Sequence, residues 1–180
     1  MPAALHRQTY ESPIGPLMML ASADGLCALE FVSERRHVRL VRRLDQWFAP
    51  YVIDDGGSPV LAAAARWLRD YFAGGLADAG PIVLDLQGTV FERRVWACLL
   101  QIPPGTTFTY GGIAGRLGIE GGARAVGLAV GSNPVSLIVP CHRVVGAHGA
   151  LTGYGGGLER KKWLLEHERT WNGRRPGRLF

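Results

Sequence analysis

The sequence lacks the features of a secreted, disulfide-linked or membrane-spanning protein. It has only three cysteines, Cys27, Cys98 and Cys141, which form neither a CxxC pair nor an even set. This excludes a disulfide framework and is typical of free thiols in a reducing compartment. No stretch reaches about 18 consecutive apolar residues, and the N-terminus has no apolar signal segment. We therefore expect a soluble, cytoplasmic protein with no membrane partner.

Charged residues are also scarce, at 19% of the chain, whereas apolar residues make up 47%. This composition excludes a disordered chain and predicts a globular protein. With 180 residues, the chain can form one large or two small domains with a packed core. The formal net charge of +5 is carried largely by arginine. Such a surplus suits a polyanionic partner but is weak evidence for one.

The first half of the chain predicts strands followed by helices. Short apolar runs separated by a turn signal predict a β-hairpin between Thr9 and Val32. From Ser33 to Phe48, apolar residues recur at helical spacing among many arginines, a pattern typical of a helix with a solvated charged face. Ser58 and Pro59 predict the start of a second helix. We place the seam between the two halves at Gly88.

The second half predicts a series of helices. Thr89 and Glu92 have the spacing of a capping box at the start of the first. Thr109 can cap a short helix that runs through Leu117, and after a glycine-containing turn another helix runs from Ala123 to about Ser132. These two short helices form a helix-turn-helix pattern, which also occurs in proteins that never bind DNA.

The second helix of this pattern is unusually thin. It contains Gly127 and Gly131 among alanines, and Arg124 is its only long polar side chain. A glycine inside a helix costs about 1 kcal/mol relative to alanine, so we expect a close approach to require it. The approach is either to a narrow groove of a partner or to a neighbouring helix, and the sequence favours neither.

A cysteine and a histidine stand side by side after an apolar run. Val135 to Val139 predicts a buried strand, and Pro140, Cys141 and His142 follow it. A thiol beside an imidazole is a nucleophile beside a base. Because consecutive side chains of a strand point to opposite faces, a bend or a bridging water would be needed between them. Taken alone, Cys141 is more simply interpreted as a small buried apolar residue.

A glycine-rich loop and a last helix follow. Six glycines crowd the segment 146–157 around Tyr154, which either lets main-chain amides approach a ligand or simply makes the loop flexible. The last helix is predicted from Leu158 to Glu168, and a basic tail covers residues 171–180.

Together these segments resemble the O6-alkylguanine-DNA alkyltransferases, also called methylated-DNA–protein-cysteine methyltransferases. The resemblance covers residues 91–168 and rests on motifs in the family's order and spacing: RVW at 94–96, IPPG at 102–105, TYG at 109–111, ARAVG at 123–127, NPV at 133–135, IVPCHRV at 138–144, GYGGG at 153–157 and WLLEHE at 163–168. SPIGPL at 12–17 also resembles the family's first hairpin, whereas the likeness is weak between residues 33 and 88.

The resemblance implies catalytic roles for five residues. Cys141 would accept the alkyl group after His142, oriented by Glu168, deprotonates it through a water molecule. Tyr110 would crowd the target phosphate and hydrogen-bond N3 of the departing guanine. Asn133 would hold the helix-turn-helix against the active site.

The resemblance also implies residues that bind DNA and the flipped base. Arg124 would enter the base stack in place of the extruded base, and the main-chain carbonyls of Cys141 and Val144 would read its exocyclic amine. The residues that would contact DNA are Arg124, Tyr110, Ala123 and Gly127. The residues that would line the substrate pocket are Tyr154, Gly155, Val144 and Val130.

The implied fold is α/β, with two domains. Residues 1–88 would form a ribonuclease-H-like domain with an antiparallel sheet and helices, and residues 89–170 a helical, winged-helix-like domain with the helix-turn-helix. The implied function is DNA repair, in which the alkyl group of O6-alkylguanine, or less readily O4-alkylthymine, passes irreversibly to Cys141. The target base would be flipped out of double-stranded DNA through the minor groove. We expect a single-turnover enzyme that is a monomer and needs no cofactor, while cooperative binding on DNA stays open.

Departures from the family pattern are few. Gly112 stands where many members have Glu or Gln, and Gly155 where some have Ser. Cys27, His6 and His37 do not have the spacing of the zinc ligands that some relatives carry, so we predict no metal.

Two alternative functions use the same residues. One is a protein that flips and senses an alkylated base without transfer, although the non-catalytic relatives replace the residue at Cys141. The other is a cysteine hydrolase that uses Cys141, His142 and Glu168.

Overall fold

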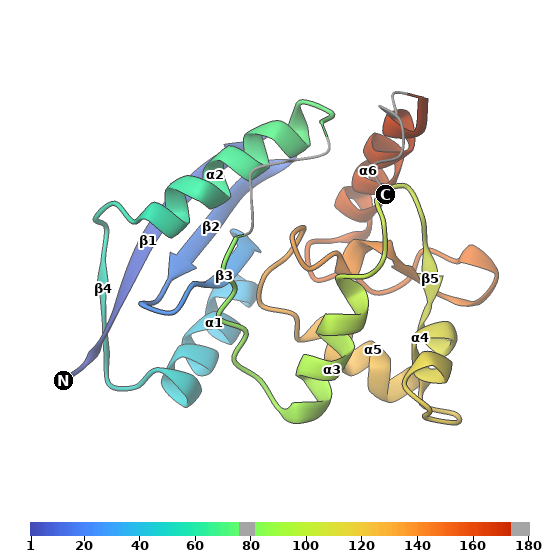
Figure 1. The fold of residues 1–180 in the computed structure, drawn as a ribbon, viewed down its shortest axis with the longest axis horizontal. Helices are drawn as coiled ribbons and strands as arrows, with labels where there is room; N and C mark the ends of the chain where they lie inside the picture. The colour runs from blue at the N-terminus through green and yellow to red at the C-terminus, as the bar shows by residue number, and fades with distance from the viewer. Residues whose placement is uncertain (76–81, 174–180) are drawn as a thin grey trace. The chain divides into compact units, whose positions relative to one another are not determined.

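The computed structural model describes residues 1–75 and 82–173 (Figure 1). These residues form two compact units: the first consists mainly of residues 1–73 and also includes 134–136, and the second consists mainly of residues 88–133 and those from 137 onward. The predicted basic tail lies outside the described residues from position 174 onward.

The first unit is built on a four-stranded sheet. Its strands are β1 (Ala3–Ser12), β2 (Gly15–Ala21), β3 (Leu26–Phe31) and β4 (Tyr51–Asp54), in the order β3-β2-β1-β4. The pairs β1–β2 and β2–β3 are antiparallel, as the hairpin pattern predicts. β4 pairs in parallel with β1, and no pattern in the sequence indicated this edge strand.

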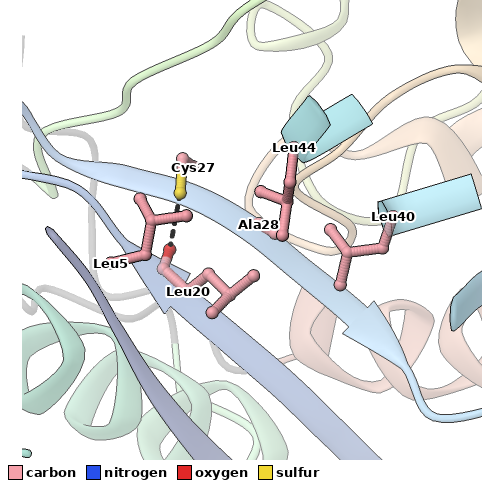
Figure 2. Close-up of a cluster of buried hydrophobic side chains, with 6 residues drawn as sticks. All are labelled: Leu5, Leu20, Cys27, Ala28, Leu40 and Leu44. Carbon is pink, nitrogen blue, oxygen red and sulfur yellow. Dashed lines mark hydrogen bonds between the residues drawn. The ribbon is translucent and has the colours of Figure 1, made fainter. Parts of the chain in front are cut away.

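Two helices pack on this sheet. α1 (Glu34–Trp47) begins at Ser33, whose hydroxyl accepts a hydrogen bond from the Arg36 amide. Its buried leucines share one apolar cluster with the sheet (Figure 2), formed by Leu5, Leu20, Cys27, Ala28, Leu40 and Leu44. Full burial of a leucine side chain contributes about 2 kcal/mol, so this cluster determines which face of α1 points inward. α2 (Pro59–Phe72) starts with proline in its first turn and contacts β1, β2 and β3.

The second unit is mainly helical. Its elements are α3 (Val90–Leu99), β5 (Phe108–Thr109), α4 (Tyr110–Arg116), α5 (Ala123–Gly131), the 3-10 turn η1 (Cys141–Arg143), β6 (Val144–Val145), the 3-10 turn η2 (Ala147–Gly149), α6 (Leu158–Arg169) and the 3-10 turn η3 (Thr170–Gly173). β5 and β6 pair in parallel as a two-stranded sheet.

α3 holds the unit together through its cap and its tryptophan. The predicted capping box is present, since Thr89 accepts from the Glu92 amide and the Glu92 carboxylate accepts from the Thr89 amide. Trp96 is fully buried, and its indole N–H donates to the Ala129 carbonyl of α5 at 2.8 Å. A Cβ atom at Gly88 would lie 2.5 Å from the Trp96 ring, so a glycine is needed there.

The helix-turn-helix is formed by α4 and α5. Thr109 caps α4 by accepting a hydrogen bond from the Gly112 amide at 2.9 Å. The turn between the helices contains Gly118 and Gly121, both at positive φ (70° and 64°), where glycine avoids the strain of a side chain. The predicted fold class is therefore confirmed: a sheet with helices in the first unit and a helical second unit.

Across residues 1–75 and 82–173, every helix is too short or too polar to cross a lipid bilayer.

Candidate active site

The segment before Cys141 is not the buried strand that the sequence predicts. Within 135–139, only Val135 forms a bridge, with β3, and the backbone then turns. Leu137 takes a left-handed conformation (φ 68°), which is costly for a bulky side chain and ends any extended run. The prediction was wrong because a short apolar run has no periodicity that separates a strand from a buried turn.

Cys141 is instead held at the start of a 3-10 turn. The Asn133 side chain donates to the Val139 carbonyl at 2.8 Å, so the end of α5 is tied to the backbone just before the cysteine. Cys141, 7% exposed, and His142, fully buried, are successive residues of η1. Because they no longer lie on a strand, the objection that their side chains point to opposite faces does not apply.

A buried network surrounds the carboxylate of Glu168. Nε2 of His142 lies 2.7 Å from Oε1 of Glu168. Arg143 donates from Nη2 to Oε1 and from Nε to Oε2, each at 2.9 Å, and from Nη1 to the Ile102 carbonyl at 2.6 Å. The Gly105 amide donates to Oε2 at 3.1 Å. Each carboxylate oxygen therefore accepts two hydrogen bonds, which satisfies a fully buried charge.

This network determines the protonation of His142. Burial alone would raise the pKa of Glu168, but hydrogen bonds from His142 and Arg143 and the positive charge of Arg143 hold that pKa well below its usual value. Burial lowers the pKa of His142, and the charges of Arg143 and Lys161 lower it further; Glu168 raises it, but the net shift is downward. At neutral pH, His142 is therefore neutral and donates its Nε2 proton to an ionised Glu168.

The other nitrogen of His142 is then a base. Nδ1 is buried and makes no hydrogen bond with any of the described residues, 1–75 and 82–173. With the proton on Nε2, Nδ1 carries a lone pair that can accept a proton.

Lys161 of α6 is a buried cation in the same unit. Its ammonium group donates to the carbonyls of Val144 at 2.5 Å, Thr152 at 2.6 Å and Gly153 at 3.2 Å. Burial lowers the pKa of Lys161 to about 8, while the charge of a Cys141 thiolate raises it. Lys161 thus holds the glycine-rich loop against β6, within electrostatic range of the cysteine.

Tyr110 shares two of these acceptors. Its hydroxyl donates to the carbonyls of Thr152 and Gly153, each at 3.3 Å. Burial raises the pKa of Tyr110, and the charge of a Cys141 thiolate raises it further. The first residue of the helix-turn-helix is therefore linked to the loop beside the cysteine.

Sequence reasoning assigned no role to Arg143 or Lys161. Lys161 lies four residues before Leu165 and seven before Glu168, so helical spacing places all three on the buried face of α6. This signal was present, but lysine in a charged helix is normally solvated. Arg143 stands inside the recognised motif, and only its contact with a residue 25 positions later reveals what it does.

The predicted pocket residues lie in three elements. Val130 of α5 and Val144 of β6 are buried, whereas Tyr154 is partly exposed and Gly155 is exposed in the loop before α6. The Val144 amide donates to the Cys141 carbonyl. The Cys141 carbonyl thus has one of its two lone pairs engaged. The Val144 carbonyl likewise has one lone pair engaged, by the hydrogen bond from Lys161, so each carbonyl has a second lone pair that can accept.

The helix α5 presents a thin, exposed face. Ala123 and Arg124 at its start are exposed, and so is Leu128, one turn after Arg124, at 74%. Sequence reasoning missed Leu128, because an apolar residue on a short helix is normally buried.

Packing against the residues that the structure describes does not require the two glycines of α5. A Cβ atom at Gly131 would meet none of their atoms within 4 Å. At Gly127 it would make only an ordinary contact with the Tyr110 ring, at 3.8 Å. Of the two explanations left open by the sequence, this favours close approach to a partner over close packing with a neighbouring helix.

Among the residues that the structure describes, no group of three or more His, Cys, Asp or Glu side chains could hold a metal ion.

A buried thiol beside a buried imidazole, on the unit that contains the helix-turn-helix, is the arrangement of a nucleophilic enzyme. Comparisons with known proteins identify the family. Residues 5–86 match the ribonuclease-like domain of 6-O-methylguanine DNA methyltransferase, and residues 90–170 match its DNA binding domain. The methylated-DNA–protein-cysteine methyltransferase of Mycobacterium tuberculosis (strain ATCC 25618 / H37Rv) is 46% identical over 169 residues, covering 92% of this chain and 93% of that protein. The protein of the same name from Shigella flexneri is 42% identical over 165 residues, covering 91% and 95%.

Solved structures agree with the sequence relatives. The crystal structure of M. tuberculosis O6-methylguanine methyltransferase matches with a TM-score of 0.76 at 43% identity, covering 97% of each chain. The structure of M. tuberculosis OGT in complex with DNA matches with a TM-score of 0.77 at 43% identity, covering 93% of this chain and 94% of that one.

The chain therefore belongs to the 6-O-methylguanine DNA methyltransferase family. This confirms the family resemblance and the enzyme class, methylated-DNA–protein-cysteine methyltransferase, that the sequence predicted. It also supports DNA as the partner and DNA repair by alkyl transfer as the activity.

Proposed function

We propose that this protein repairs double-stranded DNA by moving the alkyl group of O6-alkylguanine, and less readily of O4-alkylthymine, to Cys141 in one irreversible event. Residues 89–170 would form the alkyltransferase domain, and the protein would act as a monomer in the cytoplasm. The observation that carries the proposal is the buried His142–Glu168 pair beside Cys141, in the unit that contains the helix-turn-helix.

The first step is removal of the thiol proton. A water molecule between Cys141 Sγ and His142 Nδ1 passes the proton to the imidazole, because Nδ1 holds the available lone pair. Glu168 stabilises the imidazolium that forms. Arg143 keeps Glu168 ionised and in one orientation through its paired hydrogen bonds.

The second step is displacement at the alkyl carbon. The thiolate of Cys141 forms a carbon–sulfur bond as the bond between that carbon and O6 breaks, and the electron pair goes to the guanine. Tyr110 donates a hydrogen bond to N3 of the departing guanine and so stabilises its developing charge. The guanine gains one proton for the one that the thiol lost. The product is a thioether, which none of the residues described at the site is placed to hydrolyse, so each molecule acts once.

The DNA must deliver the base to a buried thiol. Flipping the nucleotide costs a few kcal/mol, least for a poorly paired lesion. The thin face of α5 suits the minor groove, where Arg124 would fill the vacated position in the stack. Ala123, Gly127 and Leu128 would lie along the groove beside it. The carbonyls of Cys141 and Val144 would accept hydrogen bonds from the exocyclic amine of the flipped guanine.

Mass spectrometry tests the proposal directly. After mixing with a duplex containing O6-methylguanine, the peptide with Cys141 should gain one methyl group per molecule, and Cys141→Ser should gain none. A protein that only senses the lesion would show no added mass. A cysteine hydrolase would turn over an ester or amide repeatedly, whereas we expect one stoichiometric event.

A test of the role of Arg124 needs two substrates, one that requires base flipping and one that does not. Arg124→Ala should slow repair of duplex DNA by at least about tenfold, because the flipped state loses the side chain that fills the stack. Its reaction with free O6-benzylguanine should be unchanged, since no base is flipped. Equal losses with the two substrates would remove the stack-filling role.

A further inference from the structure

The exposed face of α1 carries an arrangement that the alkyl transfer does not use. Leu40 and Leu44 pack into the sheet, and the adjacent Arg36 is 8% exposed and paired with Glu30 at 3.1 Å. These contacts define the inward face of the helix, and so they also define which side chains face away from the sheet.

Three arginines form a stripe on the outward side. At about 100° per residue, Arg35, Arg39, Arg42 and Gln46 fall within a sector of about 60°. All four are exposed. Glu34 lies about 80° from this sector, whereas Asp45, three residues after Arg42, lies beside its edge and accepts a hydrogen bond from the Tyr51 hydroxyl. No acidic side chain of α1 falls inside this sector, and we call Arg35, Arg39 and Arg42 the basic stripe.

The basic stripe is unfavourable for an isolated helix. Arg35 and Arg39 are four residues apart, and Arg39 and Arg42 are three apart, so like charges are neighbours on the surface. Arg35 also lies in the first turn, where the helix dipole disfavours a cation. A merely solvated face would gain by mixing acidic residues into these positions. A partner with dense negative charge removes the repulsion instead.

The stripe matches the spacing of a nucleic-acid backbone. At about 1.5 Å per residue, Arg35 and Arg42 are about 10 Å apart along the helix axis. This equals about three base-pair steps of 3.4 Å in duplex DNA. The arginine side chain presents a fork of donors that suits phosphate oxygens.

We propose that the basic stripe of α1 is a second DNA-binding surface, separate from the helix-turn-helix, which contacts backbone phosphates of duplex DNA without reading sequence. This revises the sequence-based interpretation of the segment 33–48 as a solvated face. The inference rests on the proposed function only in taking DNA as the partner.

The test compares two variants that lose the same charge. Arg35→Gln with Arg42→Gln alters the stripe, and Arg66→Gln with Arg69→Gln removes two exposed arginines from α2. Affinity for an unmodified duplex is measured by fluorescence anisotropy between about 50 and 200 mM salt. The stripe variant should reduce the slope of log affinity against log salt by about 1.8, since each lost phosphate contact removes about 0.9. Its affinity at about 0.1 M salt should fall by about tenfold or more, while the α2 variant should stay close to the wild type.

Other outcomes would overturn the inference. An unchanged slope in the stripe variant would mean that the arginines touch no phosphate. Equal changes in both variants would mean that only net charge matters. Both variants should react with free O6-benzylguanine at the wild-type rate, and loss of that reaction in the stripe variant alone would point to damage at the active site instead. Because alkyl transfer by the wild type is measured separately, failure of the proposed function and failure of this surface are distinguishable.

Discussion

The strongest test of the proton relay is the substitution Glu168→Gln. The carboxylate accepts four hydrogen bonds, from His142, from two nitrogens of Arg143 and from the Gly105 amide. Glutamine keeps the shape but replaces one oxygen with an NH2 group, which donates. At the Oε2 position that group would face two donors, Arg143 Nε and the Gly105 amide. At the Oε1 position it would face one donor, Arg143 Nη2, and the Nε2 atom of His142.

The second orientation is favoured, and it reverses the histidine. To accept from the new NH2 group, His142 must carry its proton on Nδ1 and its lone pair on Nε2. The atom that faces the relay is then a donor and cannot take the thiol proton. The wrong tautomer costs about 10⁴ in the serine protease triad. We expect a loss of about 10² to 10³ here, because a few per cent of a cysteine is already ionised near neutral pH.

The same change leaves Arg143 buried without its counterion, which typically costs about 3 to 5 kcal/mol of stability. The assay must therefore separate slow chemistry from unfolding. Single-turnover reaction with O6-benzylguanine does so, because unfolded protein lowers the amplitude while a lost base lowers the rate constant. The rate of Glu168→Gln should also climb about tenfold per pH unit, since hydroxide must replace the base. The wild-type rate should stay level down to the lowered pKa of His142.

Glu166→Gln is the matched control, since Glu166 is exposed on the same helix two residues earlier. It should react like the wild type. If Glu168→Gln reacted within a few-fold of the wild type and with the same pH profile, the His142–Glu168 relay would be wrong.

Three further predictions follow from the structure. The pKa values of Glu168 and His142 are both lowered on folding, so the unfolded state binds more protons in acid. Thermal unfolding should therefore show stability that falls below pH 6.5, the ordinary pKa of histidine, and falls more steeply below pH 4.5, the ordinary pKa of glutamate. A flat profile would contradict the assigned protonation. Burial raises the pKa of Cys27 to about 12, so this thiol should react slowly with iodoacetamide near neutral pH. Peptide mapping should find Cys141 labelled well before Cys27, and equal labelling would argue against an activated thiol at Cys141. Leu128→Ala should weaken duplex binding by about fivefold, which corresponds to about 1 kcal/mol of lost apolar contact. The rate of reaction with O6-benzylguanine should not change. If fluorescence anisotropy gave the same affinity as for the wild type, Leu128 would lie outside the interface.

Local interactions explain the elements that the sequence predicted well. The capping box of Thr89 and Glu92 and the Thr109 cap each join residues three apart, so their partners are already present in the local chain. The same holds for the helix-turn-helix, since the cap of α4 and the glycines of the turn lie within the segment itself. The cysteine and histidine of the site are adjacent in the chain, so the pair is apparent from the order of residues alone.

Interactions between distant residues explain what the sequence did not show. The turn before Cys141 depends on the Asn133 side chain, whose bond to a backbone carbonyl leaves no trace in the apolar pattern. The charge of Lys161 is acceptable in the interior only because three carbonyls from other segments converge on it. The parallel pairing of β4 with β1 joins residues far apart in the chain.

By itself, the amino-acid sequence determined the family and the fold class, because short motifs and local caps encode them, and it predicted Cys141 as the nucleophile. Only the tertiary structure decided which nitrogen of His142 faces Glu168 and which carries the lone pair, since that choice depends on Glu168, 26 residues later, together with Arg143. It also decided which way the arginines of α1 face, because the packing of Leu40 and Leu44 against the sheet orients the helix. Both outcomes follow from one physical cause: proton positions and helix orientations depend on partners that only folding brings within contact.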